Sequence, residues 1–179
     1  MAETIKWGID KAHSEIGFKV KHLMISTVRG QFKEYDASIL TTGEDFTTAE
    51  VDFWVDPSSI DTGSADRDNH IRTADFFDIE NHKQINFKGN TYIPVDHDGS
   101  YQLHGDLTIN GITKRVVLDA EFGGIMKDPW GNQKAIITVN GKINRKDWNL
   151  VWNVALEAGG VLVSDEVSIS CEVQLFKAQ

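Results

Sequence analysis

Apolar side chains recur at every second position along most of this chain. Because alternate residues of a strand face opposite sides, this period predicts β-strands. The alternation is clearest in the ranges 5–9, 16–20 and 167–175. Within the range 28–39 the apolar residues change parity near Lys33-Glu34, which predicts a β-bulge that bends a single strand.

Turn-forming residues separate these runs. Asn110-Gly111 is typical of a tight β-hairpin, and Asp128-Pro129-Trp130-Gly131 predicts a second turn. We expect further strand ends at Gly123-Gly124 and Gly159-Gly160. Eight or more strands, with almost no helical period and no repeat or linker, predict one all-β domain over residues 1–179. Its architecture is an antiparallel barrel or sandwich.

Residues 60–78, IDTGSADRDNHIRTADFFD, interrupt the β pattern. Ser64 can cap a helix, and Asp68 with Arg72 has the i,i+4 spacing of a helical ion pair. Asp75 can cap a second short turn that holds Phe76 and Phe77. We therefore expect a short helical insertion at about 64–80. Its two phenylalanines belong either to the core or to the wall of an apolar binding site.

Composition narrows the classes of partner. The 179 residues carry a formal net charge of −9, which argues against nucleic acid and against electrostatic docking on an anionic membrane. Cys171 is the single cysteine, so an intrachain disulfide is excluded. The N-terminus lacks the pattern of an export signal, and no apolar run is long enough for a membrane helix. We expect a cytoplasmic protein without stable membrane insertion, or a periplasmic one if a signal has been removed.

Candidate chemistry is sparse. The histidines, His13, His22, His70, His82, His97 and His104, have no spacing typical of a zinc site, so we expect no metal. Asp66 and His70 share the i,i+4 spacing, but one carboxylate and one imidazole do not make a metal site. No nucleophile elbow or glycine-rich phosphate loop is present. We expect no catalytic residues and no cofactor.

Five blocks of the chain, in order, resemble the YceI-like family of bacterial lipocalin-like, polyisoprenoid-binding proteins. The first contains Trp7, Asp10, His13-Ser14 and Val28-Arg29-Gly30-Gln31-Phe32; the second contains Ser59-Ile60-Asp61-Thr62-Gly63, His70-Ile71-Arg72 and Asp75-Phe76-Phe77-Asp78; the others are 105–114, 143–148 and 164–167. Each block is weakly specific by itself, whereas five in the same order are highly specific.

The resemblance implies an extended eight-stranded antiparallel lipocalin-like barrel, with a tunnel that holds an isoprenoid or a similar long-chain lipid. An eight-stranded barrel is wide enough inside for one small ligand. Burial of ~20 lipid carbons would contribute ~16 kcal/mol before the costs of association. The expected function is a carrier, storage or stress-related role, with a small-molecule lipid as partner, a possible homodimer and no catalysis.

Strand parity and the resemblance together select the candidate site residues. The predicted lipid-binding set is Phe18, Val20, Phe32, Phe53, Phe76, Phe77, Ile85, Phe87, Leu107, Ile109 and Trp152, and the predicted polar rim is His22, Arg67, His70 and Arg72. One alternative is an enzyme acting on a lipid-like substrate, with Asp68 and His70 as acid–base groups. Another is an interaction protein with a vestigial cavity.

Overall fold

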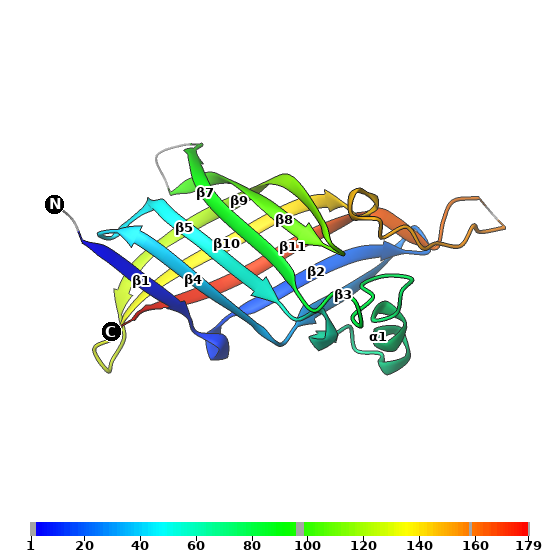
Figure 1. The fold of residues 1–179 in the computed structure, drawn as a ribbon, viewed down its shortest axis with the longest axis horizontal. Coiled ribbons are helices and arrows are strands. Elements are labelled where there is room, and N and C mark those ends of the chain that lie inside the picture. Colours follow the sequence, from blue (N-terminus) through cyan, green and yellow to red (C-terminus); the bar gives the residue numbers. More distant parts are fainter. Residues whose placement is uncertain (1–2, 96–98, 158, 179) are drawn as a thin grey trace.

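The computed structural model describes residues 3–95, 99–157 and 159–178, and within these ranges most of the chain is β-structure (Figure 1). The strands are β1 (Thr4–Ile9), β2 (Glu15–His22), β3 (Ser26–Phe32), β4 (Tyr35–Thr42), β5 (Asp45–Val55), β6 (Ile60–Asp61), β7 (Ile85–Pro94), β8 (Ser100–Ile109), β9 (Ile112–Lys127), β10 (Gln133–Asn144) and β11 (Val163–Lys177). The helices are α1 (Ala65–Ile71) and the 3₁₀ turns η1 (Lys11–His13), η2 (Pro57–Ser59) and η3 (Arg145–Trp148). No helix in the described ranges is long and apolar enough to cross a membrane.

Eight of the strands close into an antiparallel barrel, as predicted. Their order around the ring is β1-β4-β5-β7-β8-β9-β10-β11, and pairing of β1 with β11 completes it. Closure gives each of these strands a hydrogen-bonded neighbour on both sides, and barrels avoid edge-to-edge association in this way. The ring is drawn out along its axis into the elongated shape seen in Figure 1.

The remaining strands extend one side of the barrel wall. Strand β11 pairs with β1 only through Leu175–Lys177, while its residues 163–172 pair with β2. Strand β3 then pairs with β2, and the short β6 pairs with β3. The bulge predicted at Lys33-Glu34 is therefore wrong: β3 ends at Phe32 and β4 starts at Tyr35, because the two strands pair with different neighbours.

The turn predictions have mixed outcomes. Asn110 and Gly111 join β8 to β9 with left-handed φ angles of 55° and 76°, as a tight hairpin requires. Gly123-Gly124 does not end a strand. Strand β9 runs on to Lys127, and its register against β10 shifts between Ile136 and Ile137, so the glycines form a bulge.

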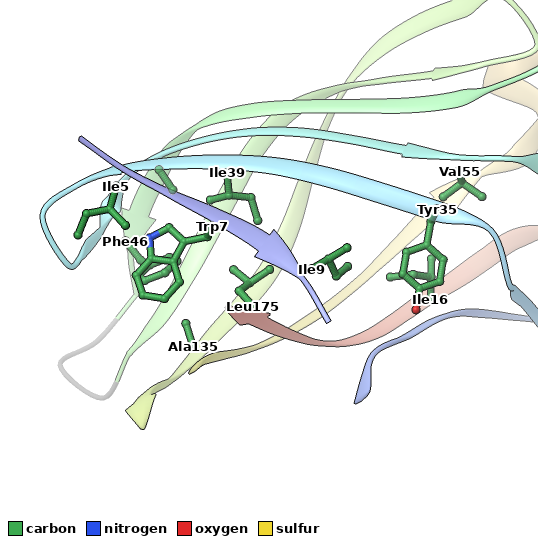
Figure 2. Packing of buried hydrophobic residues seen from close by; sticks show 11 residues of the cluster. Ile5, Trp7, Ile9, Ile16, Tyr35, Ile39, Phe46, Val55, Ala135 and Leu175 are labelled. Carbon is green, nitrogen blue, oxygen red and sulfur yellow. The ribbon is translucent and has the colours of Figure 1, made fainter. Parts of the chain in front are cut away.

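One end of the barrel is packed solid, and we call it the closed end. The side chains of Trp7, Ala135 and Leu175 are fully buried there (Figure 2). The Trp7 indole Nε1 donates to Thr41 Oγ1 at 2.9 Å. The ring centroid of Phe46 lies 5.0 Å from that of Trp7 and 4.8 Å from that of Phe122. Trp7, Phe46 and Phe122 are in contact with one another and do not line the interior cavity described below.

The insertion between β6 and β7 is only partly helical. Helix α1 begins as predicted, because the Ser64 hydroxyl caps it by accepting from the Arg67 amide at 3.3 Å. The rest of the insertion, also expected to be helical up to about residue 80, is not. Residues 72–81 form turns instead, with amide-to-carbonyl bonds such as Phe77 to Ile71 whose spacing does not fit a helix.

The ion pair predicted between Asp68 and Arg72 is also wrong. The buried Asp68 carboxylate accepts from the amide and hydroxyl of Thr62. The Arg72 guanidinium donates to the carbonyls of Ser58, at 2.9 Å, and Ile60, at 3.2 Å. Both side chains satisfy backbone groups of the preceding segment, and this docks α1 against β6.

Candidate ligand cavity

A cavity of about 570 Å³ occupies the barrel interior. That volume lies within the range of small-molecule binding sites. Its walls come from the inward-facing residues of the barrel strands, from the β2–β3 hairpin, from α1 with the turns that follow it, and from the segment between η3 and β11. Most of the lining side chains are aliphatic or aromatic, which suits an apolar ligand.

All of the apolar residues proposed from strand parity and the family resemblance line this cavity: Phe18, Val20, Phe32, Phe53, Phe76, Phe77, Ile85, Phe87, Leu107, Ile109 and Trp152. Their contact with a lipid stays a prediction. Of the predicted polar rim, His22, Arg67 and His70 also line the cavity. Arg72 does not, because its guanidinium is turned to the carbonyls before α1, and we remove it from the candidate site.

The cavity reaches the surface at the end opposite Trp7, and we call this opening the mouth. Among the described lining residues, the exposed ones are Lys21, Asp66 and Arg67. They belong to β2 and α1, which Figure 1 places toward the same end of the barrel. A ligand would therefore enter past the insertion and the β2–β3 hairpin, with the closed end ahead of it.

Aromatic rings connect the insertion to the barrel. The His70 ring lies edge-on to the Trp152 indole, with centroids 4.6 Å apart, and Phe76 lies 5.5 Å from the same indole. Phe77 instead lies 6.0 Å from Phe32, a wall residue of β3. The adjacent phenylalanines thus pack against different elements, Phe76 against the segment after η3 and Phe77 against the β3 wall.

Arg67 fixes the start of α1. Its Nε donates to the hydroxyl of Thr62 at 2.8 Å and its guanidinium also donates to the Thr62 carbonyl at 2.6 Å. Among the described residues it has no carboxylate partner within ion-pair distance. Arg67, like Arg72, therefore holds the insertion through charge-assisted hydrogen bonds to backbone and hydroxyl groups.

Arg145 is a cavity residue that sequence reasoning missed. It is 3% exposed, and its guanidinium donates only to backbone carbonyls, those of Leu150, Trp152, Val163 and Ser164. Burial lowers the pKa of this guanidinium, and the charge of Asp165 opposes that shift. Arg145 therefore holds the segment between η3 and β11 against the barrel. The parity of Ile137, Val139 and Ile143 extends to position 145 and could have identified it.

The two acid–base residues of the enzymatic alternative, Asp68 and His70, have different surroundings. Asp68 does not line the cavity, and His70 Nε2 lies 2.8 Å from Asp75 Oδ2. The two groups of the enzymatic alternative therefore do not converge on the cavity. Burial raises the pKa of Tyr92 to about 12 and that of Cys171 to about 11, so both lining residues are neutral at physiological pH.

The described residues contain no cluster of three or more potential metal ligands. His97, one of the six histidines considered from the sequence, lies outside the described residues. Within the described ranges, the structure therefore does not bring the histidines together into a metal-binding group.

A closed eight-stranded antiparallel barrel around an apolar cavity defines a lipocalin-like barrel protein. Residues 7–175 match the YceI-like domain, and the chain belongs to the YceI-like family. A UPF0312 protein of Staphylococcus epidermidis is 38% identical over 170 residues, with 94% of this chain and 96% of that protein covered.

Solved structures have the same fold. The Campylobacter jejuni YceI protein has a TM-score of 0.74 and 34% identity, covering 95% of this chain and 96% of that chain. A polyisoprenoid binding domain from Saccharophagus degradans, implicated in plant cell wall breakdown, has a TM-score of 0.72 over 97% of this chain and 98% of that one. At 13% identity, the second likeness shows the fold alone.

Proposed function

We propose that this protein binds one isoprenoid, or another long-chain lipid, inside the barrel and acts as a non-catalytic carrier or store. The observation that carries the proposal is the shape of the cavity, which is apolar along its walls, packed shut by Trp7 and Phe46 at one end, and open at a mouth. Such a cavity shields a chain from water along its length and leaves one end of the ligand near solvent.

The energetics support an apolar ligand. Each buried CH₂ contributes roughly 0.8 kcal/mol, so a chain that fills the cavity needs few polar contacts for tight binding. The polar lining groups lie mostly at the mouth, where Lys21, His22 and Arg67 can face a head group. The solved domain from Saccharophagus degradans is described as polyisoprenoid-binding, which is consistent with this ligand class.

Catalysis is not part of the proposal. Of the titratable lining residues, Tyr92 and Cys171 are neutral, and the His70 ring pairs with Asp75, which does not line the cavity. Hydrophobic burial alone accounts for retention of a lipid, so no reaction is needed to explain the cavity.

The proposal is tested with a substitution that fills part of the cavity with a larger side chain. Ala37 lines the cavity on β4, opposite Phe53 on β5. Ala37→Phe places a ring in the lumen, so lipid binding should weaken while the ligand-free protein keeps its stability within ~1–3 kcal/mol. Val117→Phe is the matched control, because Val117 is 47% exposed on the outside of β9. It adds a ring of similar size and should leave binding unchanged.

Binding is measured as a thermal shift with a purified isoprenoid, and as lipid recovered by denaturing extraction of protein from its native host. A ligand at 100 times its Kd should stabilise the parent by about 2.7 kcal/mol. Equal binding by the two variants would show that the lumen is not the site. No stoichiometric lipid and no thermal shift with the parent would favour a vestigial cavity.

A further inference from the structure

The turn between β2 and β3 exposes three consecutive apolar residues. Leu23 is 46% exposed, Met24 54% and Ile25 84%. They directly follow Lys21 and His22, which line the cavity mouth. Single exposed apolar residues are common on protein surfaces, but a contiguous apolar patch beside a binding site marks an interaction surface.

The backbone of this turn makes its sequence unusual. Leu23 and Met24 have left-handed φ angles of 54° and 68°, a conformation that bulky residues rarely adopt. In the β8–β9 hairpin Asn110 and Gly111 also have left-handed φ angles, 55° and 76°, although that loop has two residues and the β2–β3 loop has three. That second hairpin uses the residues that the conformation favours. The first keeps large apolar side chains in spite of it, as expected when they serve a function other than folding.

The segment between η3 and β11 brings more apolar surface to the same place. The Leu23 amide donates to the Leu162 carbonyl at 2.9 Å, and the Met24 side chain packs over Gly160. Val151 and Val154 are 53% and 47% exposed, on either side of the cavity residue Trp152. Figure 1 shows this segment and the hairpin projecting together from one end of the barrel. We define the apolar rim as Leu23, Met24, Ile25, Val151 and Val154.

Basic residues lie directly behind the rim. Lys19 and Arg29 are exposed on the outer face of the β2–β3 hairpin, opposite each other in its register, and the exposed Lys21 lies two residues further along β2, at the mouth. Lys21 donates to the Thr27 hydroxyl at 3.0 Å, and among the described residues none of the three has an ion-pair partner. Acids at this end of the barrel include Glu157, in the segment between η3 and β11, and the exposed Asp66 of α1. Residues 15–32 carry Lys19, Lys21 and Arg29 against the single acid Glu15, so this hairpin is positively charged although the whole chain has a net charge of −9.

We propose that the apolar rim docks the cavity mouth onto an anionic lipid bilayer, with the rim side chains in the interface and the hairpin cations against the head groups. Exposed apolar groups backed by cations are the combination that holds peripheral proteins at such interfaces. Docking gives a water-insoluble ligand a direct path between the bilayer and the lumen. The inference rests on the proposed function for what passes through the mouth, but not for docking itself.

A second copy of the chain fits the rim less well. A two-fold interface would bring the same surface of both copies together, so Lys19, Lys21 and Arg29 would approach their own counterparts. Like charges brought together oppose association. The same cations favour an anionic bilayer.

The decisive variant is Leu23→Asn/Met24→Gly, which places residues that tolerate left-handed φ angles at both positions and removes two rim side chains. We expect it to melt no lower than the parent, while its partition onto vesicles of phosphatidylcholine with phosphatidylglycerol falls about tenfold or more. Trp130→Ser is the control: Trp130 is 83% exposed, in the β9–β10 turn outside the rim, and its loss should leave partition unchanged. Vesicles of phosphatidylcholine alone should bind the parent more weakly.

Partition is measured by vesicle flotation with lipid-free protein, and isoprenoid uptake is measured separately from a detergent-solubilised stock. Unchanged flotation of the turn variant would overturn the proposal. A lower sedimentation coefficient for the turn variant than for the parent, both without vesicles, would also overturn it. That result would show that the rim binds a second copy of the chain. Flotation that persists when the parent takes up no isoprenoid would instead count against the proposed function and leave docking supported.

Discussion

Replacing both phenylalanines of the insertion should weaken lipid binding more than it destabilises the protein. Phe76 and Phe77 line the cavity, and each is only partly buried. A fully buried phenylalanine costs ~3–5 kcal/mol when truncated to alanine. Because each ring has one face on the cavity, we expect ~1–1.5 kcal/mol per ring, and ~2–3 kcal/mol for Phe76→Ala/Phe77→Ala in the ligand-free protein.

The effect on affinity follows from the other face of each ring. A lipid chain against the two rings should lose ~1 kcal/mol at each, or ~2 kcal/mol together, which corresponds to about a 30-fold rise in Kd. Arg67→Ala is the comparison, because it removes hydrogen bonds to Thr62 and leaves the rings in place. It should lower stability by ~1 kcal/mol and raise Kd by less than the double variant does.

The measurements are urea unfolding without lipid and titration with one isoprenoid, on both variants and the parent. A loss of ~4 kcal/mol or more in ligand-free unfolding of the double variant would show that the rings are core residues. An affinity loss for Arg67→Ala as large as that for the double variant would show that the position of the insertion, and not its aromatic surface, controls binding.

Three further predictions concern charge, the thiol and metal. Lys134 and His13 lower the pKa of Asp10 to about 2, so this stabilisation is complete above about pH 4 and lost as the pH falls through about 2. Asp10→Asn should therefore cost ~1 kcal/mol in unfolding experiments at neutral pH and almost nothing near pH 2. Because burial raises the pKa of the Cys171 thiol to about 11, its alkylation, followed by mass spectrometry, should be slow at neutral pH and slower still with lipid bound. Elemental analysis should find less than stoichiometric zinc, iron or copper; lipid binding lost on chelation and restored by one metal would refute this.

Local sequence patterns predicted several features of the fold. Alternation placed Ile5, Trp7 and Ile9 on the buried side of β1, because the two faces of a strand differ in solvent exposure. Turn chemistry identified the Asn110-Gly111 hairpin, since glycine and asparagine adopt left-handed φ angles at low cost. Ser64 marked the start of α1 through a cap that needs only neighbouring residues. Each of these features depends on contacts within a few residues along the chain.

Long-range pairing could not be read in the same way. Residues 28–39 look like one bent strand, yet β3 and β4 separate because their hydrogen-bonding partners lie in distant segments. Spacing suggested an ion pair between Asp68 and Arg72, but backbone groups of Thr62, Ser58 and Ile60 are closer partners. Residues 72–81 form turns and not a helix, because this segment leads the chain from α1 back to the barrel at β7.

The sequence by itself determined the β-strands, several of their turns, the cap of α1 and the apolar parity that faces the lumen, since all of these follow from local conformation and solvent exposure. Only the tertiary structure decided that β1 meets β11 to close the ring, that Trp7 and Phe46 seal one end, and that Arg145 ties the segment after η3 to the barrel. It also brought Leu23 and Met24 into contact with Leu162 and Gly160, in the segment between η3 and β11. These outcomes depend on contacts between residues far apart in the chain, whose geometry no local pattern specifies.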